Sequence, residues 1–168
     1  MLFKWSNLKS VDSELEKVPE ISLADAGLKE KDLENIVAKR VDELVRTDQL
    51  MVIFQERQRQ EEPDIIAIDE KGTLYIFELK RWQSKEENLL QVLRYGQKFG
   101  RYDYYKLNWF YQSYSHDNSG SGCLDSAHSE FFGLSTPLLK NQFNSEQQFV
   151  IVTNGLDYDT WDAIAYWR

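Results

Sequence analysis

Three ionisable residues near the middle of the chain have types and spacing that suit chemistry on a phosphate group. Asp64 follows Pro63, and Glu78 is followed two positions later by Lys80. Buried carboxylates that converge on one point repel each other, and a hard cation such as Mg²⁺ or Mn²⁺ relieves that repulsion through oxygen ligands. Such an ion can lower the pKa of a bound water and neutralise charge on the phosphate. The Lys80 ammonium can orient that water or stabilise the pentavalent phosphorus centre that forms during its attack.

Two strands joined by a tight turn are expected to position these residues. The apolar runs at residues 65–68 and 73–79 flank the turn sequence Asp-Glu-Lys-Gly, which indicates a β-hairpin. Alternation along the second run puts Glu78 and Lys80 on one face, together with the even-numbered apolar residues. Asp64 begins the antiparallel partner strand and can lie close to them. The alternative is an exposed Glu–Lys pair on an edge strand, but the Pro-Asp start and the hairpin spacing favour a site.

This set of motifs resembles the PD-(D/E)XK nuclease superfamily. The matching residues are Pro-Asp at 63–64 and Glu-Leu-Lys at 78–80, while Gln91 and Tyr95 resemble the Gln-x-x-x-Tyr motif of the RecB-like branch. The amino-acid sequence of residues 68–81 and 89–96 is most similar to the C-terminal nuclease domain of NucS-type endonucleases. The resemblance covers about residues 28–99. It implies an α/β fold of the restriction-endonuclease-like kind, with a mixed β-sheet of four or more strands flanked by helices.

The same resemblance implies a function and roles for single residues. The function would be metal-dependent hydrolysis of phosphodiester bonds in DNA, less so in RNA, by an endo- or exonuclease of DNA repair, recombination or defence. Asp64 and Glu78 would bind Mg²⁺ or Mn²⁺, and Lys80 would lie beside the attacking water. Gln91 and Tyr95, which share a helix face, would support the site and contact the substrate backbone.

A first helix is predicted at residues 28–45, and it offers a further metal ligand. Its apolar stripe consists of Leu33, Ile36, Val37, Val41 and Leu44. Glu30 falls inside that stripe and Glu34 lies at its edge. In the family that the chain resembles, a glutamate of the first helix often binds the metal, and Glu30 matches that pattern better than Glu34. Alternatively, Glu30 only favours the helix N-terminus electrostatically.

A strand predicted at residues 50–57 precedes the hairpin and carries one more acidic residue near its end. Glu56 could project toward the site, but the alternation of faces is not fixed across the polar link that follows. We therefore leave its direction open.

The charge distribution bears on binding to nucleic acid. The chain has 20 Lys and Arg against 28 Asp and Glu, a net charge of −8, and bulk acidity disfavours non-specific binding to phosphate backbones. Residues 80–106 run against this trend, with seven basic and three acidic residues. The candidate contacts to nucleic acid in this segment are Arg81, Lys85, Arg94, Lys98 and Arg101. A solvated helix face is the alternative interpretation of the same residues.

The acidity also keeps a second class of function open. The fold could serve as a catalytically silent module that binds nucleic acid or acts as a scaffold in a larger assembly. The intact set of Asp64, Glu78 and Lys80 favours the enzyme, because loss of catalysis usually removes one of the three.

Two further groups of residues have a structural and a functional interpretation. The aromatic run at residues 102–114, interleaved with Arg101 and Lys106, could stack on unpaired bases, but core packing is the commoner use of such a run. His116, Cys123 and His128 follow no zinc-ligand spacing and are interpreted as loop residues.

Length and composition indicate one domain. With 168 residues, 42% of them hydrophobic, the chain can bury a proper core. We expect an N-terminal arm at residues 1–27 that packs on a nuclease-like core at residues 28–168. The last expected elements are a buried strand at 149–153 and an amphipathic helix at 157–168. Because the chain stops inside that helix, we expect it to be a fragment of a longer protein.

The compartment is inferred from cysteine usage and from hydropathy. The single Cys123 excludes an internal disulfide and fits a reducing cytoplasm. The N-terminal residues do not resemble a signal peptide, and no apolar run has membrane-spanning length. We therefore expect a cytoplasmic protein whose partner is nucleic acid and not a membrane. Its oligomeric state stays open, with a homodimer among the alternatives.

Overall fold

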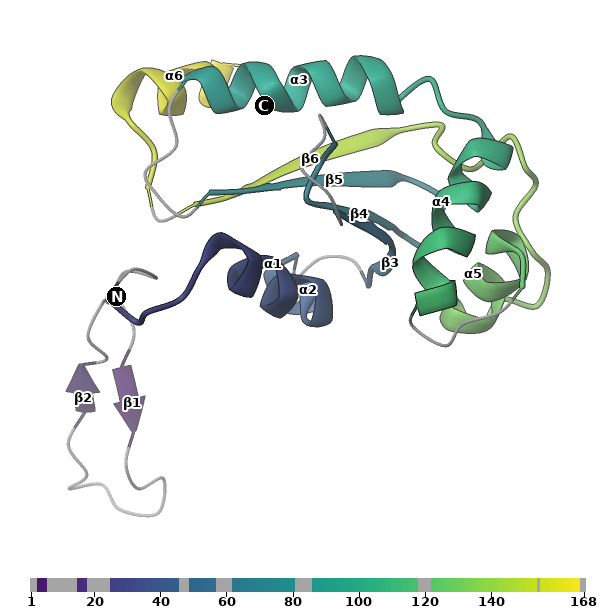
Figure 1. Ribbon diagram of the computed structural model, residues 1–168, viewed down its shortest axis with the longest axis horizontal. Helices are drawn as coiled ribbons and strands as arrows, with labels where there is room; N and C mark the ends of the chain where they lie inside the picture. The colour runs from purple at the N-terminus through teal and green to yellow at the C-terminus, as the bar shows by residue number, and fades with distance from the viewer. Residues whose placement is uncertain are drawn as a thin grey trace.

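A four-stranded mixed sheet forms the centre of the fold (Figure 1). The computed structural model describes residues 3–5, 15–17, 25–45, 49–56, 62–80, 86–117, 122–153 and 155–166. The strands, in their order across the sheet, are β3 (Met51–Gln55), β4 (Ile65–Ile68), β5 (Leu74–Leu79) and β6 (Gln147–Val152). The first three are antiparallel neighbours, and β6 is parallel to β5.

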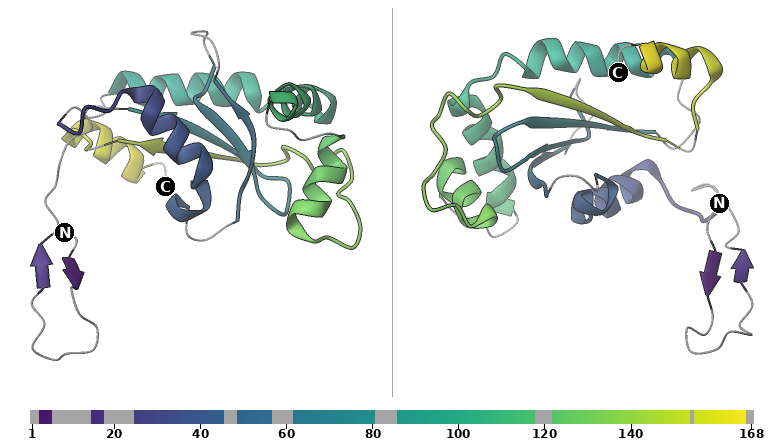
Figure 2. Two further views of the ribbon diagram at one scale, coloured as in Figure 1. Left: turned by 60° about the horizontal axis from the view of Figure 1, so that its bottom comes forward. Right: turned by 180° about the vertical axis from the view of Figure 1, so that it is seen from behind.

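Helices flank this sheet, which confirms the predicted α/β class. They are α1 (Glu30–Lys39), α2 (Val41–Leu44), α3 (Glu86–Phe99), α4 (Tyr104–Asp117), α5 (Leu124–Phe132) and α6 (Tyr158–Tyr166). Figures 1 and 2 show α3 and α6 together on one side of the sheet, α1 and α2 on the other, and α4 and α5 at one end. Two N-terminal strands, β1 (Phe3–Trp5) and β2 (Leu15–Lys17), pair with each other in a separate antiparallel sheet.

The predicted alternation along β5 is confirmed by the two hydrophobic cores. Leu74 and Ile76 belong to the core under α3 and α4, whereas Tyr75, Phe77 and Leu79 belong to the core under α1 and α2. Every residue of β4 and β5 is buried. A central hairpin with two covered faces therefore holds any charged residue at its end within a low-dielectric environment.

The turn between β4 and β5 forms as predicted. The Asp69 carboxylate accepts hydrogen bonds from the backbone N–H groups of Lys71 (2.9 Å) and Thr73 (2.8 Å). Gly72 has a φ of +90°, and a Cβ at this position would lie 2.7 Å from the Gln142 carbonyl oxygen. The turn therefore needs glycine here for its backbone conformation and for the space that it occupies.

His116 and His128 are not loop residues, contrary to the sequence interpretation, because His116 lies in α4 and His128 in α5. His128 is fully buried, and its Nε2 atom lies 2.8 Å from the Asp69 carbonyl oxygen. Burial lowers the pKa of His128, and the contact with Asp69 opposes that effect only in part. The His128 ring packs against Phe132 and Phe143, and its contact with Asp69 links α5 to the hairpin turn.

Two other elements differ from their predictions. The first helix is not continuous over residues 28–45, because the backbone of Arg40 leaves helical geometry (φ −139°) between α1 and α2. The strand β6 is not fully buried, since it lies at the edge of the sheet and Phe149 is 41% exposed. The aromatic run of α4 contributes Tyr104, Phe110 and Tyr111 to the core, as favoured.

Candidate metal centre and active site

The candidate site lies where β4 begins and β5 ends. Ile65 is paired with Phe77, so the antiparallel register brings Asp64 opposite Glu78. The Asp64 Oδ2 atom accepts a hydrogen bond of 2.6 Å from the backbone N–H of Leu79. The hairpin thus places the two carboxylate residues opposite each other.

Glu78 is a buried carboxylate with unused hydrogen-bonding capacity. The residue is 1% exposed, and its Oε1 atom forms an ion pair with the Lys80 ammonium. Its Oε2 atom is buried and has no hydrogen-bond partner within the part of the chain that the structure describes. Burial raises the pKa of Glu78, although the hydrogen bond and charge of Lys80 lower it. A buried carboxylate of this kind needs a cation or a proton.

The pKa of Asp64 is raised as well, again mainly by burial. Burial and, after it, the charge of Glu78 raise the pKa of Asp64 to about 7. The Leu79 N–H and the Lys80 charge oppose this rise, and the nearby Glu34 adds to it. Desolvation and repulsion therefore outweigh the compensation that the chain itself provides.

Lys80 remains the ammonium form in these surroundings. Burial alone would lower the pKa of Lys80, but the hydrogen bond and charge of Glu78, followed by the charges of Asp64 and Glu30, raise it. The residue follows β5, and its backbone N–H donates to the Val152 carbonyl oxygen at 2.8 Å. The sheet therefore anchors the backbone of a lysine whose side chain stays positively charged.

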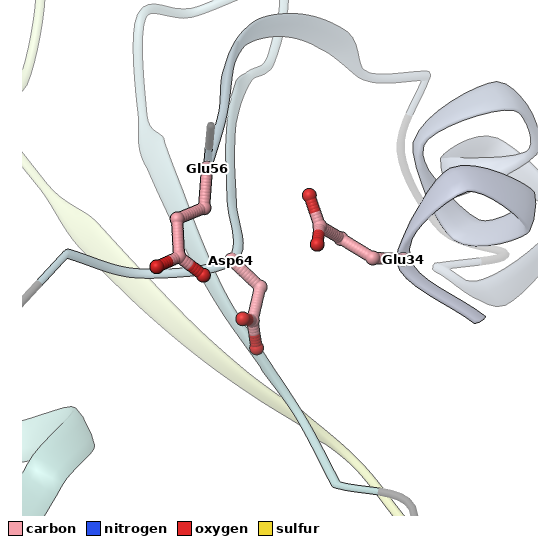
Figure 3. Close-up of side chains that lie close together, drawn as sticks. All are labelled: Glu34, Glu56 and Asp64. Carbon is pink, nitrogen blue, oxygen red and sulfur yellow. The ribbon is translucent and has the colours of Figure 1, made fainter. Parts of the chain in front are cut away.

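Two further carboxylates lie close to Asp64 (Figure 3). One carboxylate oxygen each of Glu34, Glu56 and Asp64 lie within 4.8 Å of one another. Figure 3 shows the Glu34 side chain extending from α1 toward the other two. Glu56 follows β3 directly, and its backbone N–H donates to the Asp64 carbonyl oxygen at 2.8 Å. Three elements thus supply the group: α1, the end of β3 and the start of β4.

The buried acid of the first helix is Glu34, whereas Glu30 is exposed at the first position of α1. The expectation that Glu30 occupies the buried face and Glu34 only its edge is therefore wrong. Ile36 and Leu44, which were counted in the apolar stripe, are 50% and 48% exposed, so the buried face is rotated toward Glu34. Glu30 still acts on the site from a distance, because its charge raises the pKa of Glu78 and of Lys80.

Lys31 is a residue of the site that the sequence did not reveal. Its Nζ atom lies 2.5 Å from Glu34 Oε1 and donates to the Glu56 carbonyl oxygen at 2.5 Å. The side chain thus joins α1 to the end of β3 across the acidic group. The only available signal was the Lys-x-x-Glu spacing within one helix, which is common on helix surfaces.

Gln91 and Tyr95 lie on α3 and contact each other. The Gln91 amide donates to the Tyr95 hydroxyl oxygen at 2.7 Å. Burial raises the pKa of Tyr95 to about 12, and the charges of Glu78 and Asp64 contribute to the rise. The pair therefore lies within electrostatic reach of both carboxylates, on the α3 side of the sheet.

The predicted nucleic-acid contacts are placed only in part. Arg94, Lys98 and Arg101 are exposed, on α3 and directly after it. Arg81 and Lys85 lie outside the described residues. In the described part of the chain, no helix is long and apolar enough to cross a membrane.

The donor set fits a hard divalent cation. Glu34, Glu56, Asp64 and Glu78 offer only carboxylate oxygens, which suit Mg²⁺ or Mn²⁺ and not a soft metal that prefers thiolate. The Oε2 atom of Glu78, which has no hydrogen-bond partner among the described residues, supplies a further acceptor. The site therefore has the oxygen chemistry that such an ion requires.

Comparisons with known proteins give one structural likeness. No family model matches the chain, and no curated protein is similar to it in sequence. Among solved structures, the chain is similar to the crystal structure of a repair endonuclease from Pyrococcus abyssi, with 14% sequence identity and a TM-score of 0.45. The alignment covers 92% of this chain and 47% of the other, so this chain spans about half the length of that protein.

Proposed function

We propose that the chain is a metal-dependent nuclease that hydrolyses phosphodiester bonds in DNA, with RNA as the less favoured substrate. The observation that carries the proposal is the buried Glu78 Oε2 atom, which has no hydrogen-bond partner among the described residues. It lies at the end of a strand beside Asp64, whose pKa is raised to about 7. Buried carboxylates that are compensated only in part destabilise a fold, and binding of a cation would relieve both Asp64 and Glu78.

Asp64 and Glu78 are the proposed metal ligands. A bound Mg²⁺ or Mn²⁺ ion would supply Lewis acidity toward the phosphate and toward water. The hydrogen bond from Leu79 fixes the Asp64 carboxylate, which limits the reorganisation that binding requires. Glu34, buried on α1, and Glu56, directly after β3, are further proposed ligands.

The proposed role of Lys80 is electrostatic. Because Glu78 holds it in the ammonium form, Lys80 is suited to donate hydrogen bonds and not to accept a proton from water. It can orient the attacking water and stabilise the negative charge that develops on the phosphate oxygens. Tyr95, oriented by Gln91, would position the reacting groups from α3.

The substrate backbone is proposed to run along α3. Arg94 and Lys98 are exposed on this helix, and Arg101 follows it, so the three cations lie near the helix that carries Tyr95. Cations in such a row neutralise successive phosphates, and this would offset the net charge of −8 of the chain. The overall acidity favours the alternative, a silent scaffold or binding module, and the experiment below separates the two.

The test is cleavage of labelled single-stranded, duplex and branched DNA and of RNA with Mg²⁺, Mn²⁺ or EDTA. We expect product with a divalent cation and none with EDTA. Glu78→Gln and Asp64→Asn proteins purified in parallel should be inactive, whereas Glu130→Gln, at an exposed position on α5, should cleave at the wild-type rate. Equal cleavage by the wild type and Glu78→Gln would indicate a contaminating nuclease and overturn the proposal. Nucleic-acid binding without cleavage would favour the silent module.

A further inference from the structure

The helix α4 divides its aromatic residues between two faces. Tyr104, Phe110 and Tyr111 are buried against β3 and its neighbours. Tyr105 is 65% exposed and Trp109 is 54% exposed. These two are four residues apart and therefore adjacent on the helix surface. Single exposed apolar residues need no explanation, whereas two exposed aromatic residues one turn apart put two rings on the same face of the helix.

Two lysines stand over these rings. The Lys106 Nζ atom is 4.2 Å from the centroid of the Trp109 ring, and the Lys140 Nζ atom is 4.8 Å from that of Tyr105. Lys140 belongs to the segment after α5, so the positive charge comes from two parts of the chain. Cation–π contacts of this kind orient the rings, and more than half of each aromatic residue stays open to solvent.

The nearest acidic residue in sequence does not cancel this charge at the rings. One carboxylate oxygen of Asp103 accepts a hydrogen bond of 2.9 Å from the backbone N–H of Lys106, at the start of α4. Asp103 thus caps the helix, while the Lys106 side chain extends toward Trp109 and, at 5.2 Å, toward Phe110. The patch combines partly exposed aromatic rings with positive charge.

We propose that Tyr105 and Trp109, flanked by Lys106 and Lys140, form a stacking platform for unpaired nucleobases of a single-stranded nucleic acid. Each base of such a strand has a π-face that stacks on an aromatic side chain, and each nucleotide carries a phosphate that attracts a lysine. A continuous duplex keeps its bases stacked on each other and cannot offer these faces to a convex helix. The combination of rings and cations therefore selects an unpaired segment.

The relevance of the platform to substrate choice rests on the proposed nuclease function. The helix α4 packs in the same core as Leu74 and Ile76, the β5 residues that share the face of Glu78. It also covers β3, the strand that leads into Glu56.

Binding can be tested apart from cleavage. The anisotropy of a fluorescent oligothymidylate would be measured in EDTA, so that no metal-dependent hydrolysis occurs. We expect Trp109→Ala and Tyr105→Ala each to raise Kd by about 5- to 150-fold, which corresponds to roughly 1–3 kcal/mol per stacked base. Trp161→Ala removes an equally exposed tryptophan (58%) from α6 and should leave Kd unchanged. Thermal unfolding would show that the variants are folded.

An abasic oligonucleotide of the same length separates stacking from charge. The wild-type protein should bind it more weakly than oligothymidylate, and Trp109→Ala should cause no further loss. Lys106→Gln should weaken binding to both oligonucleotides and reduce the salt dependence. Wild-type affinity in Trp109→Ala and Tyr105→Ala, or equal affinity for the abasic strand, would overturn the platform and leave the patch as a protein contact. If the wild-type protein stacks on bases as expected but cleaves no substrate, the nuclease proposal alone is overturned.

Discussion

The backbone N–H of Leu79 donates a 2.6 Å hydrogen bond to Asp64 Oδ2, so the first carboxylate is fixed to the strand that carries the second. This bond lowers the pKa of Asp64, yet burial and Glu78 raise that pKa to about 7. The local structure therefore holds Asp64 in place without supplying enough positive charge to keep it ionised. We interpret this as a site prepared for a cation.

The first prediction concerns stability against pH without metal. Because the pKa of Asp64 rises from 3.8 to about 7 on folding, the folded state binds the proton more tightly than the unfolded state. The stabilisation is fully present below about pH 4 and is lost as the pH rises through about 7. The melting temperature in EDTA should fall across this range. In Asp64→Asn the melting temperature should fall less with pH. Above about pH 7 this variant should be more stable than the wild type by about 1 kcal/mol or more.

A matched control isolates the effect of Asp64. Glu130→Gln removes an exposed carboxylate from α5 and should keep the wild-type dependence on pH. Some slope should remain in Asp64→Asn, because burial also raises the pKa of Glu78. Added Mg²⁺ or Mn²⁺ should stabilise the wild type most at the alkaline end of this pH range, where the Asp64 and Glu78 carboxylates are deprotonated and can bind the ion. A melting temperature that rises from about pH 4 to about pH 7 in EDTA would contradict the assignment.

The second prediction compares two glutamates of the same helix. Glu34 is 4% exposed and lies in the acidic group, whereas Glu30 is exposed one turn earlier. Glu34→Gln should weaken Mn²⁺ binding by about 10-fold or more, and Glu30→Gln should change it by much less, since long-range charge is screened. Isothermal titration calorimetry with Mn²⁺ would measure both. A larger effect of Glu30→Gln would restore Glu30 as the helix ligand.

The hairpin and its charged residues were predictable because their signals are local. Alternation, a turn sequence and a short loop determine the register of two antiparallel strands, and the register brings Asp64 opposite Glu78. The same reasoning places Glu78 and Lys80 on one face. Nothing beyond neighbouring residues is needed for this part of the site.

The remaining carboxylates depend on information that is not local. The register of β3 shifts between Val52 and Phe54, so counting alternate residues along this strand cannot give the direction of Glu56. The buried face of α1 depends on how the helix packs on the sheet, which leaves Ile36 exposed and Glu34 covered. His128 is buried through a contact with Asp69, 59 residues away in the chain, and no local pattern reports such a contact.

The third prediction tests α3 as a surface for the phosphate backbone. Arg94 and Lys98 are exposed on this helix. Arg94→Glu and Lys98→Glu should each weaken binding of DNA in EDTA and reduce the slope of log K against log salt by about one unit per lost contact. Lys71→Glu, an exposed reversal in the hairpin turn, should lower affinity only through net charge and keep the slope. Identical salt titrations for all variants would remove α3 from the binding surface.

The last prediction separates an enzyme from a scaffold through Lys80. Its ion pair with Glu78 is partly buried, yet a scaffold would use it only for local stability. In an enzyme, Lys80→Ala should keep the fold, bind Mn²⁺ at least as well because a competing cation is gone, and cleave about 10²-fold more slowly or worse. Glu78→Gln should instead lose Mn²⁺ binding and cleavage together, and Lys71→Ala should change neither. Calorimetry with Mn²⁺ and a cleavage time course on the same preparations would distinguish the three patterns. If Lys80→Ala cleaves at the wild-type rate, the activity does not come from this site, and the scaffold becomes the better interpretation.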